Sequence, residues 1–388
     1  MPPRIDARNA SFAEDAAADS ADVVISCFEN EVPAFVGPTM EQLYGNLFSS
    51  MLQFDLSGLD HASTSTYVAR EGARVVALFL FQRRHSRLRV LNETIRIDAA
   101  EVRRFVRYIF ARYPSVGVVS FNAVEVRPAA LGYPFQHVNQ LEDIAMALPA
   151  TPDAYLAGLG KNMRRNVRRY TERVTRAFPD YQFRCHEREA VDEALVRSII
   201  GFNHARMANK QKASNLDEQA VRRVTHLARA AGLVGVVTID GRECAGAISY
   251  RVGANYFLDI LAHDPAYDDY WVGILCCYQT IRACILRGGR EFHFLWGRYD
   301  YKFTLGATLR ELDALAVYRS RVQMLLHADL ALKLAYDGRR RRLKLWLESD
   351  DAHQREGWSK FAFRCLMNIV EMKRAATSRL GEHFSRRG

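Results

Sequence analysis

Residues 254–295 read ANYFLDILAHDPAYDDYWVGILCCYQTIRACILRGGREFHFL, and this stretch decides the fold. Residues 254–264 are rich in aromatic and branched side chains, which predicts a strand. Residues 270–287 are largely apolar and predict a buried helix, which Gly288–Gly289 ends. Residues 290–295 predict another strand. The stretch is therefore expected to fold as strand, helix and strand.

The flanking segments extend this unit into a sheet. Asp240–Gly241 lies between two apolar runs, which is a strong hairpin signal. The other elements predicted in this half are a strand at 181–187, helices at 189–209 and 216–231, a loop or short helix at 296–307 and a final strand at 309–319.

The N-terminal half predicts a second block of mixed α/β structure. Its helix, at residues 98–113, has an apolar face. The predicted strands are 65–71 and 74–84 around a turn at Glu71–Gly72, then 115–124 and 142–149.

Residues 161–177, KNMRRNVRRYTERVTRA, predict an amphipathic helix with a basic face. Met163, Val167, Tyr170 and Val174 recur with helical spacing on its apolar side. Like charges four residues apart repel one another. We therefore expect the helix to dock through its apolar side and to present a basic stripe to solvent or to an anion. The stripe consists of Lys161, Arg164, Arg165, Arg168 and Arg169.

The composition and the net charge limit the kinds of binding partner but do not identify one. The chain has 388 residues and a formal net charge of +10, with 49% hydrophobic and 25% charged residues. Such a composition is typical of globular proteins, and the length predicts two or three domains. The positive charge favours nucleic acid, a phosphorylated cofactor or anionic lipid as a partner, or serves solubility alone.

The cysteines and the missing targeting signals indicate the cellular compartment of the protein. The seven cysteines form no C-x-x-C pair that would start a zinc site, so buried free thiols in a reducing compartment are expected. The N-terminus lacks an apolar signal region, and residues 1–20 are expected to be disordered. No segment reaches the apolar length of a membrane span, so we predict a cytoplasmic protein.

Three stretches of the second half resemble GNAT N-acyltransferases, in particular the CelD/BcsL group associated with cellulose and exopolysaccharide biosynthesis. Their order along the chain, with the strands between them, is also that of the GNAT fold around its acyl-CoA site. The resemblance covers residues 150–320, and the N-terminal half is similar in architecture only. The stretches are the Arg-rich GKNMRRNVRRYTERV (160–174), the helix YWVGILCCYQTIRACILRGG (270–289) and the Tyr-Lys motif FHFLWGRYDYKFTLGA (292–307).

The resemblance implies an α/β (α+β) fold with tandem GNAT-like lobes. It implies a mixed, mostly antiparallel central sheet flanked by helices, followed by a helical tail. The related FemAB-type transferases are similar to two such lobes in tandem. The expected domains are a disordered N-terminus (1–20), an N-terminal GNAT-like lobe (21–150), a C-terminal acyltransferase domain (151–320) and a basic helical tail (321–388).

Two departures from the family pattern concern the site. Members carry acidic residues around the Gly of the last motif, as D-f-x-x-G-D/E, whereas this chain has His293 and Arg298 there, with acidity only at Asp300. The pyrophosphate loop Q/R-x-x-G-x-G/A is missing, and residues 269–273, DYWVG, precede the helix instead. A helix N-terminus still offers free N–H groups to a pyrophosphate.

Asp259, His263 and Tyr301 are the catalytic candidates, because GNAT transfer needs a base and an acid near the splayed central strands. Strict alternation puts Asp259 and Leu261 on one face of their strand, opposite Ile260. His263 is a candidate base, and Tyr301 a candidate acid for the leaving thiolate. A purely structural role also stays open for each residue: an ion pair for Asp259, a surface imidazole for His263 and a buried, hydrogen-bonded side chain for Tyr301.

Val272, Gly273, Lys302 and Arg298 are the candidates for binding the acyl donor. The first two would offer backbone N–H groups, and the two cations would bind phosphate or remain on the surface. Helix-dipole complementarity at a helix end is the favoured explanation of His204 and Arg206, and a place at the border of the acceptor pocket is the alternative. A solvated face, a phosphate site and a tRNA surface remain alternatives for a further set, Arg164, Arg165, Arg168 and Arg169.

These features predict an acyltransferase that uses acyl-CoA (acetyl-CoA) and no metal to modify an amine or hydroxyl of a saccharide or exopolysaccharide precursor. The second hypothesis is a FemAB-like aminoacyl transferase using charged tRNA, and the third is a non-catalytic anion- or nucleic-acid-binding protein. No RRM or helix-turn-helix signature supports nucleic acid. Residues 338–347, GRRRRLKLWL, predict a peripheral contact with an anionic membrane surface.

Overall fold

The computed structural model describes residues 23–128, 131–209 and 216–347. The predicted disordered segment 1–20 and the last part of the predicted tail, 348–388, lie outside these residues. The described strands form one 12-stranded sheet in the order β1-β2-β3-β4-β5-β12-β6-β11-β10-β9-β8-β7. They are β1 (Val23–Phe28), β2 (Thr64–Glu71), β3 (Arg74–Arg84), β4 (Arg87–Val90), β5 (Val118–Val124), β6 (Phe135–Ala147), β7 (Gln182–Glu187), β8 (Gly232–Ile239), β9 (Arg242–Val252), β10 (Asn255–His263), β11 (Glu291–His293) and β12 (Thr308–Tyr318).

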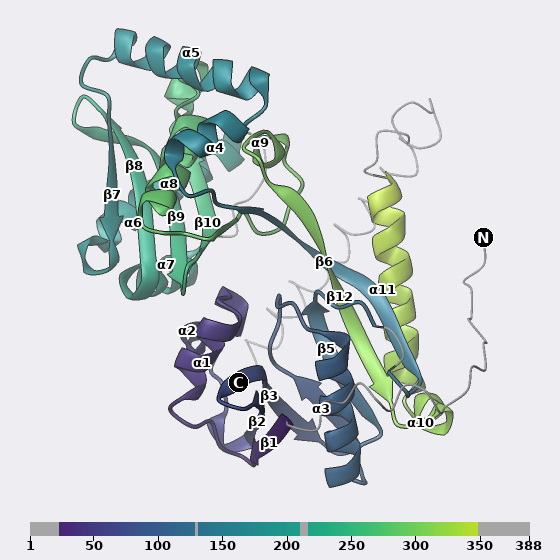
Figure 1. Cartoon of the computed structure of the whole chain (residues 1–388). Helices are drawn as coiled ribbons and strands as arrows, with labels where there is room; N and C mark the ends of the chain where they lie inside the picture. Colours follow the sequence, from purple (N-terminus) through teal and green to yellow (C-terminus); the bar gives the residue numbers. More distant parts are fainter. Residues whose placement is uncertain (1–22, 129–130, 210–215, 348–388) are drawn as a thin grey trace, which may run out of the picture.

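Two structural repeats follow each other along the chain, the first from β1 to β6 and the second from β7 to β12 (Figure 1). In each repeat the first four strands pair antiparallel, and the fourth pairs in parallel with the fifth. A helix joins each parallel pair, as parallel strands require a crossover. These helices are α3 (Ala99–Arg112) and α8 (Val272–Leu286); the pairs after the first strands are α1 (Val36–Leu43) with α2 (Met51–Leu56), and α6 (Glu193–Asn209) with α7 (Glu218–Ala231).

The sixth strands are exchanged between the repeats. β6 pairs antiparallel with β11 of the second repeat, and β12 pairs antiparallel with β5 of the first. β6 and β12 also pair with each other, from Ala145–Thr308 to Phe135–Val317. Figure 1 shows these two long strands running from one half of the molecule into the other. They join the two repeats into a single sheet.

Helices cover both faces of each half. Along β12, Leu315 and Val317 pack into the core beneath α3, whereas Ala316 and Tyr318 pack beneath the C-terminal helices, as alternation in a strand requires. In the second half α8 shares one core with the two helices that precede β7, and α6 and α7 cover the other face. The helices not yet introduced are α4 (Pro152–Gly158), α5 (Lys161–Ala177), α9 (Asp300–Thr304), α10 (Arg321–Leu326) and α11 (Ala328–Leu347).

The basic helix α5 confirms its sequence prediction. Its apolar residues Met163, Val167, Tyr170 and Val174 are buried in the core with α8, and its basic residues are exposed. The break before α5 is also present, because α4 ends at Gly158.

Two strands were not predicted, β1 and β4, and β6 begins at Phe135 rather than at residue 142. β4 has only four residues, and two of them are arginines, so its pairing with neighbours decides its conformation rather than its own propensity. The predicted mixed α/β fold, with a large and mostly antiparallel sheet flanked by helices, is confirmed. None of the helices in the described ranges is both long and apolar enough to cross a bilayer.

Candidate active site

A cleft opens where the parallel strands β10 and β11 separate. They pair at three positions only, from Asn255–Glu291 to Phe257–His293. The cleft beyond has a volume of about 500 Å³, and its walls come from α6, β10, the start of α8 and residues 294–302. Five predicted site residues line it: Asp259, His263, Gly273, Tyr301 and Lys302.

A β-bulge at Asp259 shapes one wall of the cleft. The register between β9 and β10 skips Asp259 between Leu258 and Ile260, so its backbone is left out of the ladder. The predicted alternation is therefore wrong beyond this point. Leu258, before the bulge, packs in the core that contains α8, whereas Ile260, two residues later, packs in the core under α6 and α7.

The Asp259 carboxylate is held by one hydrogen bond and one distant cation. The Tyr250 hydroxyl donates to Oδ2 at 2.8 Å, and Nη2 of Arg223, on α7, lies 3.7 Å from the same oxygen. Burial raises the pKa of Tyr250 well above its usual value, so this hydroxyl remains a donor. The Asp259 side chain keeps 22% exposure, which leaves it accessible from the cleft.

The first turn of α8 presents backbone N–H groups at the cleft. Trp271, just before the helix, has a left-handed backbone with φ of 57°, and the turn has neither a side-chain cap nor an acidic residue. Gly273 and Ile274 line the cleft. The Val272 side chain is fully buried, so only its backbone is available to a ligand. Such an uncapped helix start favours an anion.

Gly273 is required because His263 lies against it. A Cβ at Gly273 would lie 2.6 Å from Nδ1 of His263. The other ring nitrogen, Nε2, lies 2.7 Å from Oδ1 of Asp268. Because both nitrogens face the segment that leads into α8, the imidazole fixes the position of this helix start.

Lys302 is almost completely buried, with 3% exposure. Its ammonium donates to the carbonyl oxygens of Phe294 and Trp296, each at 2.7 Å, and so holds the segment after β11 in place. Burial lowers the pKa of Lys302 to about 8. An ammonium has three N–H donors, so one remains for a group in the cleft.

Tyr301 comes from the same short helix, α9, and lines the cleft. Its ring packs edge-on against Phe294, with centroids 6.2 Å apart. Burial raises the pKa of its hydroxyl above the ordinary value, so the group is protonated at neutral pH.

Arg298 is placed outside the cleft lining. Its Nε and Nη2 each lie 2.8 Å from Oε2 of Glu142, on β6. Arg341 of α11 contacts the same oxygen at 3.1 Å. The carboxylate therefore joins the segment after β11 to the C-terminal helix, and Arg298 has a structural partner that its sequence did not predict.

A buried charge cluster lies where β6, β11 and β12 meet, and sequence reasoning missed it. Nδ1 of His293 is 2.7 Å from Oδ2 of Asp143, and its Nε2 is 3.3 Å from Oε2 of Glu291. Burial opposes charge on His293, yet hydrogen bonds to the two carboxylates raise its pKa. Burial likewise disfavours charge on Glu291, but His293 and Arg310 lower its pKa to about 2.

This cluster supplies a carboxylate at the place where His293 departs from the pattern of the resembled group. The family pattern has an acidic residue at this place, and here Asp143 of β6 brings a carboxylate to the imidazole instead. Asp143 comes 150 residues earlier in the chain, so no local sequence signal connects the two.

Arg206 lines the cleft, although its sequence position favoured dipole complementarity. Its Nε is buried and has no hydrogen-bond partner within the part of the chain that the structure describes. Its neighbour His204 is exposed, and its Nε2 lies 2.8 Å from the carbonyl oxygen of Leu216. The packing of α6 across β10 places Arg206 at the cleft, and the sequence alone does not show this packing.

The arginines of α5 are not among the residues that line the cleft. Arg164 donates to the carbonyl oxygens of Ala157 and Leu159, at 2.7 and 2.8 Å, and so caps the end of α4. Arg165, Arg168 and Arg169 are exposed. The helix touches the site indirectly, because Tyr170 stacks on Trp271, with ring centroids 5.0 Å apart.

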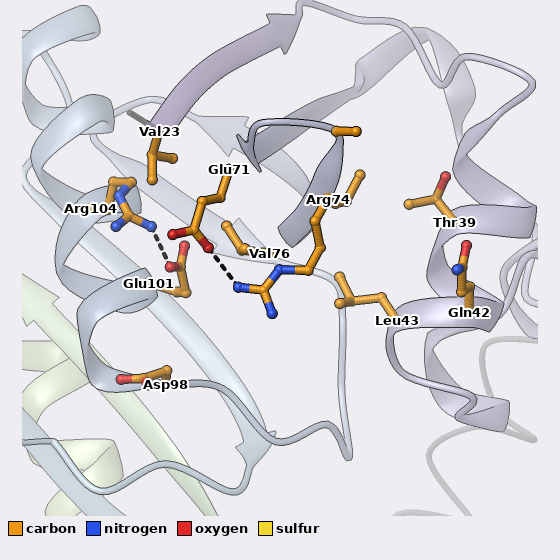
Figure 2. Close-up of a pocket in the computed structure, with 12 residues that line it drawn as sticks. Val23, Thr39, Gln42, Leu43, Glu71, Arg74, Val76, Asp98, Glu101 and Arg104 are labelled. Atoms are coloured by element: carbon orange, nitrogen blue, oxygen red, sulfur yellow. Dashed lines mark hydrogen bonds and ion pairs between the residues drawn. The ribbon is translucent and has the colours of Figure 1, made fainter. Parts of the chain in front are cut away.

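The first repeat has no equivalent open helix start. Asp98 accepts a hydrogen bond from the N–H of Ala100 at the start of α3, and Glu101 occupies the first turn. A cavity of about 640 Å³ lies beside this end of α3. Figure 2 shows that its charges pair with one another, Arg74 with Glu71 and Arg104 with Glu101. An anion would meet three carboxylates there, those of Glu71, Asp98 and Glu101.

Comparison with known proteins places the cleft in a recognised domain. Residues 161–303 match the acetyltransferase (GNAT) domain family, so the second repeat has the GNAT acyltransferase fold. No curated protein matches the sequence.

Solved structures are similar to this chain at low sequence identity. The crystal structure of FemX has 10% identity and a TM-score of 0.56, covering 78% of this chain and 99% of that chain. L-PGS from Bacillus licheniformis has 16% identity and a TM-score of 0.45, covering 78% and 98%. A tandem GNAT protein from the clavulanic acid biosynthesis pathway has 12% identity and a TM-score of 0.38, covering 76% and 98%. At this identity the likeness to FemX concerns the fold alone.

Proposed function

We propose that the protein is an acyl-CoA-dependent acyltransferase that modifies an amine or hydroxyl on a saccharide or exopolysaccharide precursor, as in the CelD/BcsL group. The observation that carries the proposal is the uncapped start of α8 in the β10–β11 cleft of the GNAT-matching segment. In the first repeat the corresponding helix start is occupied by Asp98 and Glu101. We therefore assign donor binding to the second repeat only.

Donor binding would use the backbone more than side chains. The N–H groups of Gly273 and Ile274 would bind the pyrophosphate of the donor, where the helix dipole favours negative charge. Gly273 leaves room for the His263 imidazole, which lies against this helix start. Arg206 supplies a cation in the same cleft. The bulge at Asp259 leaves backbone groups free to polarise the thioester carbonyl.

The transfer itself would be a direct displacement. The acceptor nitrogen or oxygen attacks the thioester carbon, so a C–N or C–O bond forms and the C–S bond breaks. Asp259 is the candidate base for the acceptor proton, and the protonated Tyr301 hydroxyl is the candidate acid for the leaving thiolate. The Lys302 ammonium stabilises negative charge that develops nearby. His263 serves as a positioning residue, since both its nitrogens face the α8 start.

A FemAB-like aminoacyl transfer from charged tRNA is the second candidate. The observation that favours it is the exposed basic stripe of α5, next to the Trp271 segment that leads into the cleft. A stripe of this kind fits a phosphate backbone as well as a smaller anion.

Ligand-dependent thermal stability separates the hypotheses. A ligand at about 100 times its Kd stabilises the native state by about 2.7 kcal/mol, so the unfolding midpoint should rise with acetyl-CoA. Charged tRNA at the same fixed salt concentration is the comparison. Stabilisation by tRNA alone would favour the second candidate, and no response to either would favour a non-catalytic protein.

Release of free CoA in the presence of amino- and hydroxy-saccharides tests the chemistry. Tyr301→Phe should keep the stabilisation by acetyl-CoA and lose most of the turnover, because it removes only the hydroxyl. A Tyr301→Phe variant with unchanged turnover would contradict the role of this residue as the acid.

A further inference from the structure

A basic groove of about 610 Å³ lies between the sheet of the first repeat and α11. Its floor comes from β5, β6 and β12, and one side of α11 forms a wall. Four cations from that wall line it: Lys333, Arg340, Arg341 and Lys344. Arg89 of β4 adds a fifth from the sheet, and Asp337 is the one acidic side chain among the described lining residues.

Close packing at Gly338 sets the shape of this groove. A Cβ at Gly338 would lie 3.2 Å from the Val138 side chain, so α11 crosses β6 where only a small residue fits. One turn later Arg341 reaches the sheet and bonds to Asn139 and to Glu142. Figure 1 shows α11 running along β6. The wall is therefore held in position by the fold.

The groove keeps positive charge that the described protein does not neutralise. Arg89 pairs with Glu93 at 3.1 Å, and Arg341 pairs with Glu142. Lys333 and Arg340 have no ion-pair partner within the described ranges. Seven residues separate these two cations, which places them two turns apart on the same side of the helix. A ligand with two or more negative charges can contact both.

The groove is connected to the donor cleft through one carboxylate. Glu142 binds Arg341, which lines the groove, and also Arg298. Arg298 follows two residues after Trp296, which lines the donor cleft. The Glu142 carboxylate therefore links the wall of the groove to the segment that contributes Trp296 to the donor cleft.

We infer that this groove binds the diphosphate of the acceptor substrate, an inference that rests on the proposed function. The acceptor class is then a sugar diphosphate, either a soluble sugar nucleotide or a polyprenyl-linked sugar. Both sources share the diphosphate that Lys333 and Arg340 contact.

Equilibrium binding to the full chain at fixed low salt tests the inference, with saturating acetyl-CoA present so that the donor site at the start of α8 is occupied. The probes are inorganic pyrophosphate, UDP-N-acetylglucosamine for the nucleotide source and farnesyl diphosphate for the polyprenyl source. Lys333→Glu with Arg340→Glu should weaken pyrophosphate binding by about 100-fold or more, since each lost charge-assisted contact is worth about tenfold. The probe that gains most over pyrophosphate identifies the source.

Two matched controls locate the effect. Arg339→Glu with Arg342→Glu makes the same charge change on the opposite, exposed side of α11, and should alter binding by less than about threefold. Arg165→Glu with Arg168→Glu does the same on α5. Circular dichroism confirms that each variant is folded.

The inference is overturned if pyrophosphate fails to bind, or if either control pair weakens binding as much as the groove pair. Acetyl-CoA stabilisation is measured in the same variants, and the groove variant should retain it. Pyrophosphate binding without any acetyl-CoA response would sink the proposed function while leaving the groove as an anion site.

Discussion

Lys302 carries a charge in a place where water barely reaches it. Two carbonyl oxygens satisfy two of its donors, and burial lowers its pKa to about 8. A lysine on the surface would neither hold these carbonyl oxygens nor have a lowered pKa, because its ammonium would stay hydrated. At the residue scale the site is thus built from groups whose environment, rather than identity, defines their chemistry.

Replacing Lys302 by Met should change how stability depends on pH. The pKa of Lys302 is about 8 in the folded protein, against an ordinary value of 10.5 for a lysine. Between these pH values the unfolded chain binds more protons, so the contribution of Lys302 to the free energy of unfolding rises with pH. Urea unfolding from pH 7 to 11 should show that, within that pH range, the free energy of unfolding of the wild type rises relative to that of Lys302→Met. A difference that is constant with pH would refute the buried ammonium.

The same variant should lose about 100-fold in kcat if the ammonium stabilises developing charge. CoA release under saturating donor measures this, and acetyl-CoA stabilisation shows whether the cleft remains intact. Unchanged kcat would leave Lys302 with its structural role only.

The pair Asp143–His293 has the opposite pH dependence. The pKa of His293 is raised, so its stabilising contribution is complete below its unfolded pKa of about 6.5 and is lost as pH rises through the folded value. Asp143→Asn should cost about 3–5 kcal/mol near pH 6, because a buried partner is left unpaired. That cost should shrink towards pH 9. Chemical denaturation across this range measures it, with the exposed Glu311→Gln as control; a cost that grows with pH would contradict the assignment.

At the scale of single elements, the start of α8 shows how a strand and a helix are matched. β10 ends in His263, and the first turn of α8 contains Gly273 because the imidazole fills the space that a Cβ would take. The Asp259 bulge in the same strand shifts Ile260 and Leu261 onto opposite faces from those predicted. One strand thus positions both ends of the cleft.

Gly273→Ala tests this match. The added methyl should destabilise the protein by about 1–3 kcal/mol through overpacking, and it should abolish stabilisation by acetyl-CoA. Adding His263→Ala should restore much of the stability, because the clash disappears. A double-mutant cycle by urea denaturation measures the coupling; strictly additive effects would mean that the two residues do not compete for space.

Local pattern predicted the elements well and their partners poorly. The boundaries of α5 followed from helical spacing that alternates apolar and basic sides, and the order of strands in the second half followed from turns such as Asp240–Gly241. The bulge at Asp259 and the pairing of Asp143 with His293 did not, because both depend on the neighbouring strand. Arg206 entered the cleft only through the packing of α6.

The whole molecule is one sheet made by two repeats that exchange their last strands. β11 of the second repeat has β6 as its neighbour, and β5 of the first repeat has β12. Neither repeat can complete its own half of the sheet. We therefore expect the two halves to unfold together.

Cutting the chain at the expected boundary tests this. Residues 151–320 alone should expose an unpaired edge at β11 and aggregate, since unpaired edges recruit other strands. Coexpression of 1–150 with 151–388 should restore solubility and acetyl-CoA stabilisation, because β6 is supplied in trans. A soluble, acetyl-CoA-binding 151–320 fragment would show that the exchange is dispensable. Size-exclusion chromatography and thermal unfolding provide the readouts.

The exchanged β6 also limits how this protein can be recombined with its relatives. A crossover near residue 150 would inherit Asp143 and Glu142 from one parent, and their partners His293 and Arg298 from the other. Changes at these four positions must therefore be inherited together, although they lie in opposite halves of the gene. Selection that acts on the donor cleft of the second repeat therefore also acts on β6 of the first repeat.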